Sequence, residues 1–138
     1  MIHLIAIVFT LTLMALPGCA KPFQPVPPTF KLWQKPNISE DGIKKAMLEC
    51  GYPTPFEAID RQAINGTLIR HTTNDEIALM ELCMEQSGFV SKTQRFCDLF
   101  PRLEACQSDN VKLVPKRDIS RRLGGAYCVK NKNTLACK

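Results

Sequence analysis

The sequence predicts a small, mainly α-helical domain that is held together by disulfide bonds. Three observations lead to this fold class: apolar residues recur at helical spacing, capping residues flank them, and six cysteines follow residue 19. The chain has 138 residues, of which seven are cysteine. A domain of this size buries only a limited core, so covalent cross-links contribute a large share of its stability.

The first predicted helix lies between Ser39 and Gly51. Ser39 is a favourable N-cap, and Gly51 is a natural C-terminal stop. One face of this helix is apolar, through residues at positions i, i+3, i+4 and i+7: Ile43, Ala46, Met47 and Cys50. We therefore expect Cys50 to point into the core.

The second predicted helix lies between Thr73 and Gly88 and is apolar over most of its circumference. Thr73 or Asn74 caps it, and Glu76 completes a capping box. A helix this apolar is mostly buried, apart from a narrow solvated stripe through Glu81 and Glu85. Cys83 lies among the buried positions, so a Cys50–Cys83 disulfide is expected.

Two later segments share a C-x8-C pattern, Cys97 to Cys106 and Cys128 to Cys137. Each segment can close a small loop with its own disulfide. Six cysteines allow 15 connectivities, so the spacing favours this pairing without establishing it. Between the two loops, a short helix is expected to begin at Asp118 and to end at Gly124-Gly125.

The first residues form an uncharged apolar leader from Ile2 to Pro17. Its length fits the h-region of a signal peptide and is too short to span a bilayer. Its end, Leu16-Pro17-Gly18-Cys19, resembles the bacterial lipobox, which implies that Cys19 is acylated and becomes the mature N-terminus. The alternative is ordinary signal-peptide cleavage after Ala20, which would release a soluble secreted protein.

These boundaries predict three parts: a lipoprotein signal peptide at 1–18, a lipidated cysteine with a proline-rich tether at 19–36, and a disulfide-rich helical domain at 37–138. Proline density in the tether favours extended backbone. At its end, Phe30, Leu32 and Trp33 are expected to pack on the domain as a first strand or lasso. With Cys19 set aside, the cysteines form an even set, as is typical of exported disulfide frameworks: Cys50, Cys83, Cys97, Cys106, Cys128 and Cys137.

The sequence gives little support to catalysis, metal binding or a cofactor. After the leader, His71 is the single histidine, and no serine lies in a Gly-x-Ser-x-Gly context. The cysteines lack the close C-x2-C pairs of zinc and thioredoxin-like sites. We therefore expect a non-enzymatic protein without cofactor or metal, with a hydrolase centred on His71 as a third hypothesis.

Charge is unevenly distributed along the chain. Residues 107–138 carry eight basic and two acidic side chains, a net charge of +6, whereas residues 20–106 carry ten and eleven, a net charge of −1. Such a region can attract anionic envelope material or an acidic protein partner. Nucleic acid is not expected, because no aromatic residues interleave the basic ones. The candidate binding residues are Lys116, Arg117, Arg121, Arg122, Lys130 and Lys132.

Short motifs along the middle of the chain resemble those of a loose group of small lipoproteins of Gram-negative bacteria and their phages. The motifs are Trp33-x-Lys35-Pro36, Glu49-Cys50-Gly51, and Cys83-Met84 followed by Gly88-Phe89. The group has no common activity to carry over. Ala20 after the lipidated cysteine resembles the outer-membrane sorting signal. The resemblance implies an anchored lipoprotein of the outer membrane, on its periplasmic face or at the cell surface. The alternative remains a secreted, unlipidated effector or inhibitor.

Overall fold

The computed structural model describes residues 25–57, 72–107 and 114–138. The predictions that concern the leader, Cys19 and His71 fall outside these ranges. Within them the chain is mainly α-helical, as predicted. The elements in chain order are η1 (Thr29–Leu32), β1 (Trp33–Gln34), α2 (Glu40–Glu49), α3 (Asn74–Gln86), β2 (Val90–Ser91), α4 (Phe96–Leu99), η3 (Glu104–Cys106), α5 (Ile119–Gly124), α6 (Ala126–Lys130) and η5 (Leu135–Cys137).

The two longest helices begin as the sequence predicts. The Ser39 hydroxyl accepts a hydrogen bond from the amide of Gly42 at the start of α2. At the start of α3, Thr73 and Glu76 form a reciprocal capping box. Gly51 and Gly88 follow the two helices with φ of 99° and 81°, a left-handed conformation that glycine adopts without strain.

The main core lies between α2, α3 and the N-terminal segment. Ala46, Met47 and Met84 are fully buried, and Phe30 and Trp33 pack against them from η1 and β1. The prediction that these two aromatic residues pack on the domain is confirmed. The packed part of the chain therefore includes η1 and β1, which lie within the range 19–36 predicted for the tether.

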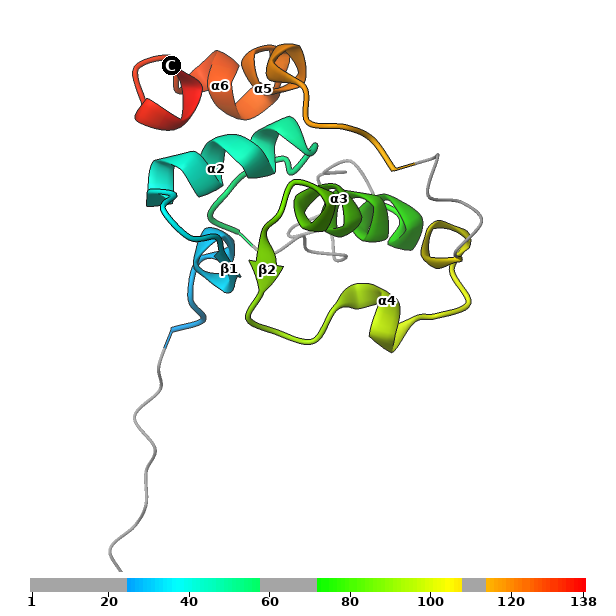
Figure 1. The fold of residues 1–138 in the computed structure, drawn as a ribbon. Coiled ribbons are helices and arrows are strands. Elements are labelled where there is room, and N and C mark those ends of the chain that lie inside the picture. Colours follow the sequence, from blue (N-terminus) through cyan, green and yellow to red (C-terminus); the bar gives the residue numbers. More distant parts are fainter. Residues whose placement is uncertain (1–24, 58–71, 108–113) are drawn as a thin grey trace, which may run out of the picture.

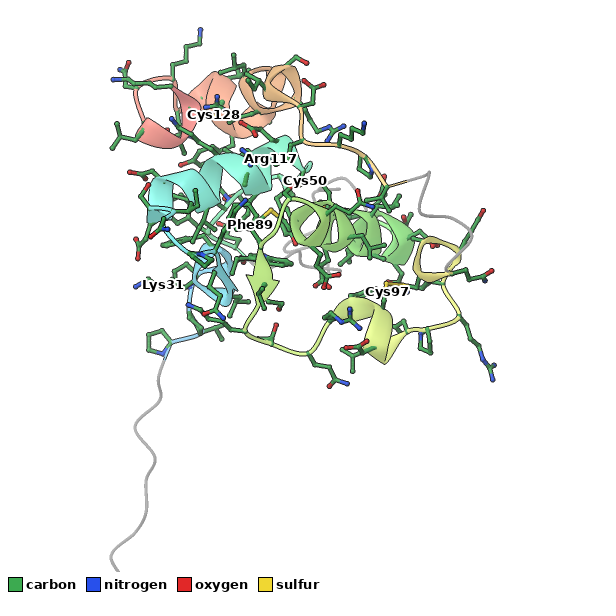
Figure 2. The ribbon with its side chains drawn as sticks, in the orientation of Figure 1. Lys31, Cys50, Phe89, Cys97, Arg117 and Cys128 are labelled. Atoms are coloured by element: carbon green, nitrogen blue, oxygen red, sulfur yellow. A yellow bond between two sulfur atoms is a disulfide. The ribbon has the colours of Figure 1, made fainter. Side chains whose placement is uncertain are left out.

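All three predicted disulfides are present. Cys50–Cys83 joins α2 to α3 across a separation of 33 residues. Cys97–Cys106 and Cys128–Cys137 each close a loop with a separation of nine residues. Figure 2 shows the first bridge inside the molecule and the other two toward opposite ends. The domain is therefore cross-linked both through its centre and within each peripheral loop.

The Cys97–Cys106 segment packs along α3 (Figure 1). The amide of Phe96 donates to Glu81 Oε2 at 2.7 Å, and the amide of Ala105 donates to Asp75 Oδ1 at 2.9 Å. Two carboxylates of α3 thus hold this segment by its main chain. The prediction that Glu81 lies on a solvated stripe is therefore wrong, because α4 covers it.

Residues 116–138 form an outer layer over α2, which we call the C-terminal layer (Figure 1). Asp118 Oδ1 accepts the amide of Ser120, so the predicted N-cap of α5 is confirmed. Gly125 ends α5 and directly precedes α6, a helix that the sequence did not predict. This layer brings the basic end of the chain against a single helix.

Candidate functional site

The C-terminal layer packs on α2 through a small apolar cluster. Cys128, Ala136 and Cys137 bury their side chains around Leu48, and Tyr127 packs at the edge. This cluster is separate from the main core, so α2 is buried on two sides. Few apolar contacts hold the layer on α2, so the polar contacts at its edge contribute a larger part of the stability of this packing.

A buried carboxylate next to this cluster pairs with two arginines of the layer. Glu49, the last residue of α2, is buried although it is charged. Arg117 Nε donates to its Oε2 at 2.8 Å, and Arg117 Nη2 lies 2.6 Å from the same oxygen. Arg122 Nε lies 3.1 Å from Oε1, at ion-pair distance but without the alignment of a hydrogen bond to any described residue. Buried charges persist when they are paired in this way.

The same residues complete the C-terminal end of α2. The main-chain carbonyl of Glu49 accepts hydrogen bonds from Arg121 Nη1 at 2.6 Å and from the amide of Asp118 at 3.2 Å. The last carbonyls of a helix lack partners within the helix, and a cation there also interacts favourably with the helix dipole. The segment that starts the C-terminal layer therefore caps α2.

Arg122 belongs to the interior of the layer. Its side chain is buried, and its Nη1 donates to the main-chain oxygens of Ala136 and Lys138 at 3.0 and 2.9 Å. The expectation that Arg122 binds a partner at the surface is therefore corrected, because its donors join α5 to η5 and to Glu49.

The other candidate binding residues are partly or fully accessible. Lys116, Lys130 and Lys132 are exposed. Arg121 is exposed, although its Nη1 is engaged with Glu49. The Arg117 side chain is 36% exposed beside the same carboxylate. The structure thus divides the candidate binding residues into three exposed lysines and three arginines that hold the layer in place.

A second charged group lies where α4 meets α3. Burial raises the pKa of Glu81. Burial also raises the pKa of Glu85, and the charge of Arg95 offsets part of that effect. Arg95 Nη2 pairs with Asp98 Oδ1 at 2.7 Å and, through Nη1, with Glu85 at 3.8 Å. The hydrogen bonds from Arg95 lower the pKa of Asp98. The visible partners of these carboxylates are main-chain amides and an arginine, an arrangement typical of a structural role.

A shallow hollow lies on the Cys97–Cys106 loop. It encloses about 360 Å³, and its lining is mainly apolar: Leu99, Phe100, Pro101, Arg102 and Leu103. Leu99 is half exposed there. The hollow lies across α3 from the C-terminal layer and shares no residue with it.

Within the three described ranges, no cluster of three His, Cys, Asp or Glu side chains is placed to hold a metal ion. In the same residues, no helix is long and apolar enough to cross a membrane.

The functional residue that sequence reasoning missed is Glu49. In the sequence it stands out only as part of the Glu49-Cys50-Gly51 motif. Its burial depends on a layer that folds over α2, and its partner Arg117 lies 68 residues further along the chain. Comparison of the chain with protein-family models, with curated proteins and with solved structures found no match to any of them.

Proposed function

We propose that this protein is an exported lipoprotein of the bacterial outer membrane, anchored through acylated Cys19, whose role is binding rather than catalysis. The observation that carries the proposal is the cysteine pairing. Six cysteines form three disulfides, so Cys19 is the one cysteine left over. It directly follows an apolar leader and a small residue, as an acylated cysteine does. Disulfides of this density are typical of exported domains.

The contact surface in this proposal is the outer side of the C-terminal layer. Lys116, Lys130 and Lys132 are exposed there and have no acidic partner among the described residues. Lysines that are free in this way attract anionic material of the cell envelope. Arg117, Arg121 and Arg122 contribute to binding indirectly, because they hold in place the layer that presents the lysines.

The anchor is tested by the intact mass of the protein, extracted from its native host and alkylated without reduction. We expect a species that begins at Cys19, carries acyl chains and has no alkylated thiol. The matched variant Cys19→Ala should lose the acyl mass and retain all three disulfides. A lipid-free species that begins at Lys21 would instead establish the secreted effector or inhibitor, and any alkylated cysteine would contradict the pairing.

The contact surface is tested by retention on envelope material from the same host. Lys130→Glu with Lys132→Glu should weaken retention, and added salt should do the same to the parent protein. Lys31→Glu with Lys92→Glu is the matched control, because both lysines are exposed and lie outside the layer. Equal retention of all three proteins at every salt concentration would contradict the proposal.

A further inference from the structure

The C-terminal layer exposes aliphatic side chains as well as lysines. Four large aliphatic residues of the layer are half exposed or more: Ile119, Leu123, Val129 and Leu135. They come from α5, α6 and η5, so each element of the layer contributes. Aliphatic side chains scattered singly on a surface need no explanation, but a group from one short segment marks a candidate contact surface.

The packing of the layer on α2 leaves these four side chains exposed. The side chains that the layer turns toward α2 are Arg122, Cys128, Ala136 and Cys137, all of them buried. On α5, Ile119 and Leu123 are four residues apart and share one face of the helix, and both side chains are exposed whereas that of Arg122 is buried. In Figure 1 the layer lies at one end of the molecule, and no described element lies beyond it.

The charges of the segment that carries these aliphatic residues are almost all positive. Asp118 is the single acidic residue in the segment 114–138, and the neighbouring lysines are exposed: Lys116, Lys130, Lys132 and Lys138. The buried arginine that could have added to this charge is paired with Glu49. The surface is thus apolar where α5, α6 and η5 turn outward and cationic beside them.

We propose that the outer surface of the C-terminal layer docks onto an anionic lipid bilayer. This inference rests on the proposed function and names the anionic material. A soluble or cell-wall polymer would pair with the lysines and leave the aliphatic side chains in water. A bilayer interface accommodates both kinds of side chain, because the lysines contact lipid phosphates and the aliphatic groups enter the boundary of the acyl chains.

The docking is peripheral and separate from the acyl anchor. α5 has six residues and α6 has five, so these helices can lie on a membrane surface but cannot cross it. The N-terminal segment enters the fold through η1, which packs on α2, and Figure 2 shows Lys31 and Cys128 on opposite sides of that helix. Phe56 bridges the two sides, because its ring contacts both Phe30 of η1 and Tyr127 of α6. The layer is therefore a membrane contact in addition to the acyl anchor.

The test uses a protein without the lipid, so that the acyl anchor does not bind the vesicles. Every described element lies at residue 25 or beyond, so residues 20–138, exported behind a cleaved leader, contain the whole described fold. Binding is measured by co-sedimentation with vesicles of phosphatidylcholine alone and of an equal mixture of phosphatidylglycerol and phosphatidylcholine. Each variant is first checked for native circular dichroism and for the absence of free thiols.

We expect binding to the mixed vesicles and little binding to pure phosphatidylcholine. Lys130→Gln with Lys132→Gln should weaken binding about tenfold or more, from the loss of two cations near the surface. Ile119→Ser with Leu123→Ser should weaken it by a similar factor of about ten, from the loss of apolar insertion.

A matched pair of valines gives the sharpest control. Val129 on α6 is 54% exposed and Val90 on β2 is 56% exposed, and only the first lies in the C-terminal layer. Val129→Ser should weaken vesicle binding, whereas Val90→Ser should leave it unchanged.

The remaining outcomes separate this inference from the proposed function. Vesicle binding that depends on the lysines but not on the aliphatic residues would overturn the inference and leave a purely electrostatic contact surface. Retention on soluble polyphosphate without any vesicle binding would also overturn it, and would leave the proposed function standing. Absence of binding to both probes would overturn the inference and the proposed contact surface together, and the acyl anchor would still be decided by the intact mass.

Discussion

Glu49 shows how one charged residue can organise the packing of a whole layer. Its carboxylate is buried between Arg117 and Arg122, and its main-chain carbonyl accepts a hydrogen bond from Arg121. Breaking a buried ion pair by removing one partner is costly, because the other charge stays desolvated. The role of Glu49 is therefore best tested by neutralising it.

Glu49→Gln should lower the free energy of unfolding by about 3 kcal/mol, since Arg122 would remain buried without a counter-charge. Chemical denaturation of the oxidised protein measures this. Glu57→Gln, at an exposed glutamate, is the control and should change stability by less than about 0.5 kcal/mol. Equal stability of the two variants would show that the arginines do not depend on Glu49.

Glu81 gives a pH dependence of defined sign. Burial raises its pKa above the ordinary value of 4.5, and the hydrogen bond from the Phe96 amide offsets only part of this effect. The folded state thus binds this proton more tightly than the unfolded state. The stabilising contribution is fully present below the unfolded pKa and is lost as the pH rises through the folded pKa.

Glu81→Gln removes this titration and keeps an oxygen that can accept from Phe96. The stability of the variant minus that of the parent should therefore be larger near neutral pH than below pH 4.5, because only the parent loses stability as the pH rises. Denaturant midpoints for both proteins across this interval measure the difference. A difference in midpoint that is constant with pH would contradict the assignment.

At the scale of single elements, the sequence predicted what depends on neighbours along the chain. The caps at Ser39, Thr73 and Asp118 are local hydrogen bonds, and all three are confirmed. The second buried side of α2 was not predicted. Leu48 and Glu49 lie off the apolar stripe of α2 and become buried only because a distant segment covers them.

The disulfides should differ in what they contribute. Cys50–Cys83 closes the longest loop, and its two sulfurs lie in the main core. In the loop-entropy description, Cys50→Ala with Cys83→Ala should cost about 4 kcal/mol, and Cys128→Ala with Cys137→Ala about 2.5 kcal/mol. Denaturation of each double variant measures these costs. The opposite order would show that native-state contacts, rather than loop length, set the contribution.

Considered whole, the molecule has a main core and one attached layer. α2 and α3 are joined by a disulfide and by the larger apolar cluster, whereas the C-terminal layer is held by a small cluster and by the pairs around Glu49. Regions with fewer buried apolar contacts open at a lower free energy than the core. We therefore regard the layer as a unit that can open alone.

Native-state hydrogen exchange measures this directly. Amides of α5 and α6 should exchange through a lower-energy opening than those of α3, and Glu49→Gln should reduce protection in α5 and α6 far more than in α3. Identical exchange energies in the three helices would mean that the molecule opens as a single unit.

The sequence predicted which residues of the candidate site are basic, but not which of them are exposed and which are buried. Residues 107–138 were correctly identified as the basic part of the chain by counting charges. Counting could not separate Arg122, which is buried against Glu49, from Lys130, which is exposed. That distinction depends on a tertiary contact, and no local pattern encodes it.

The placement of the disulfides also has a mechanical consequence. A load on the N-terminus reaches the fold at Phe30 and Trp33, and then passes along α2 to Cys50. From Cys50 the load passes through the disulfide directly to Cys83, so the segment between these two cysteines does not extend under tension. The two nine-residue loops are closed in the same way. A domain pulled at its N-terminus would therefore lengthen through its unbridged segments, and the bridged loops would keep their ends together even after the helices had come apart.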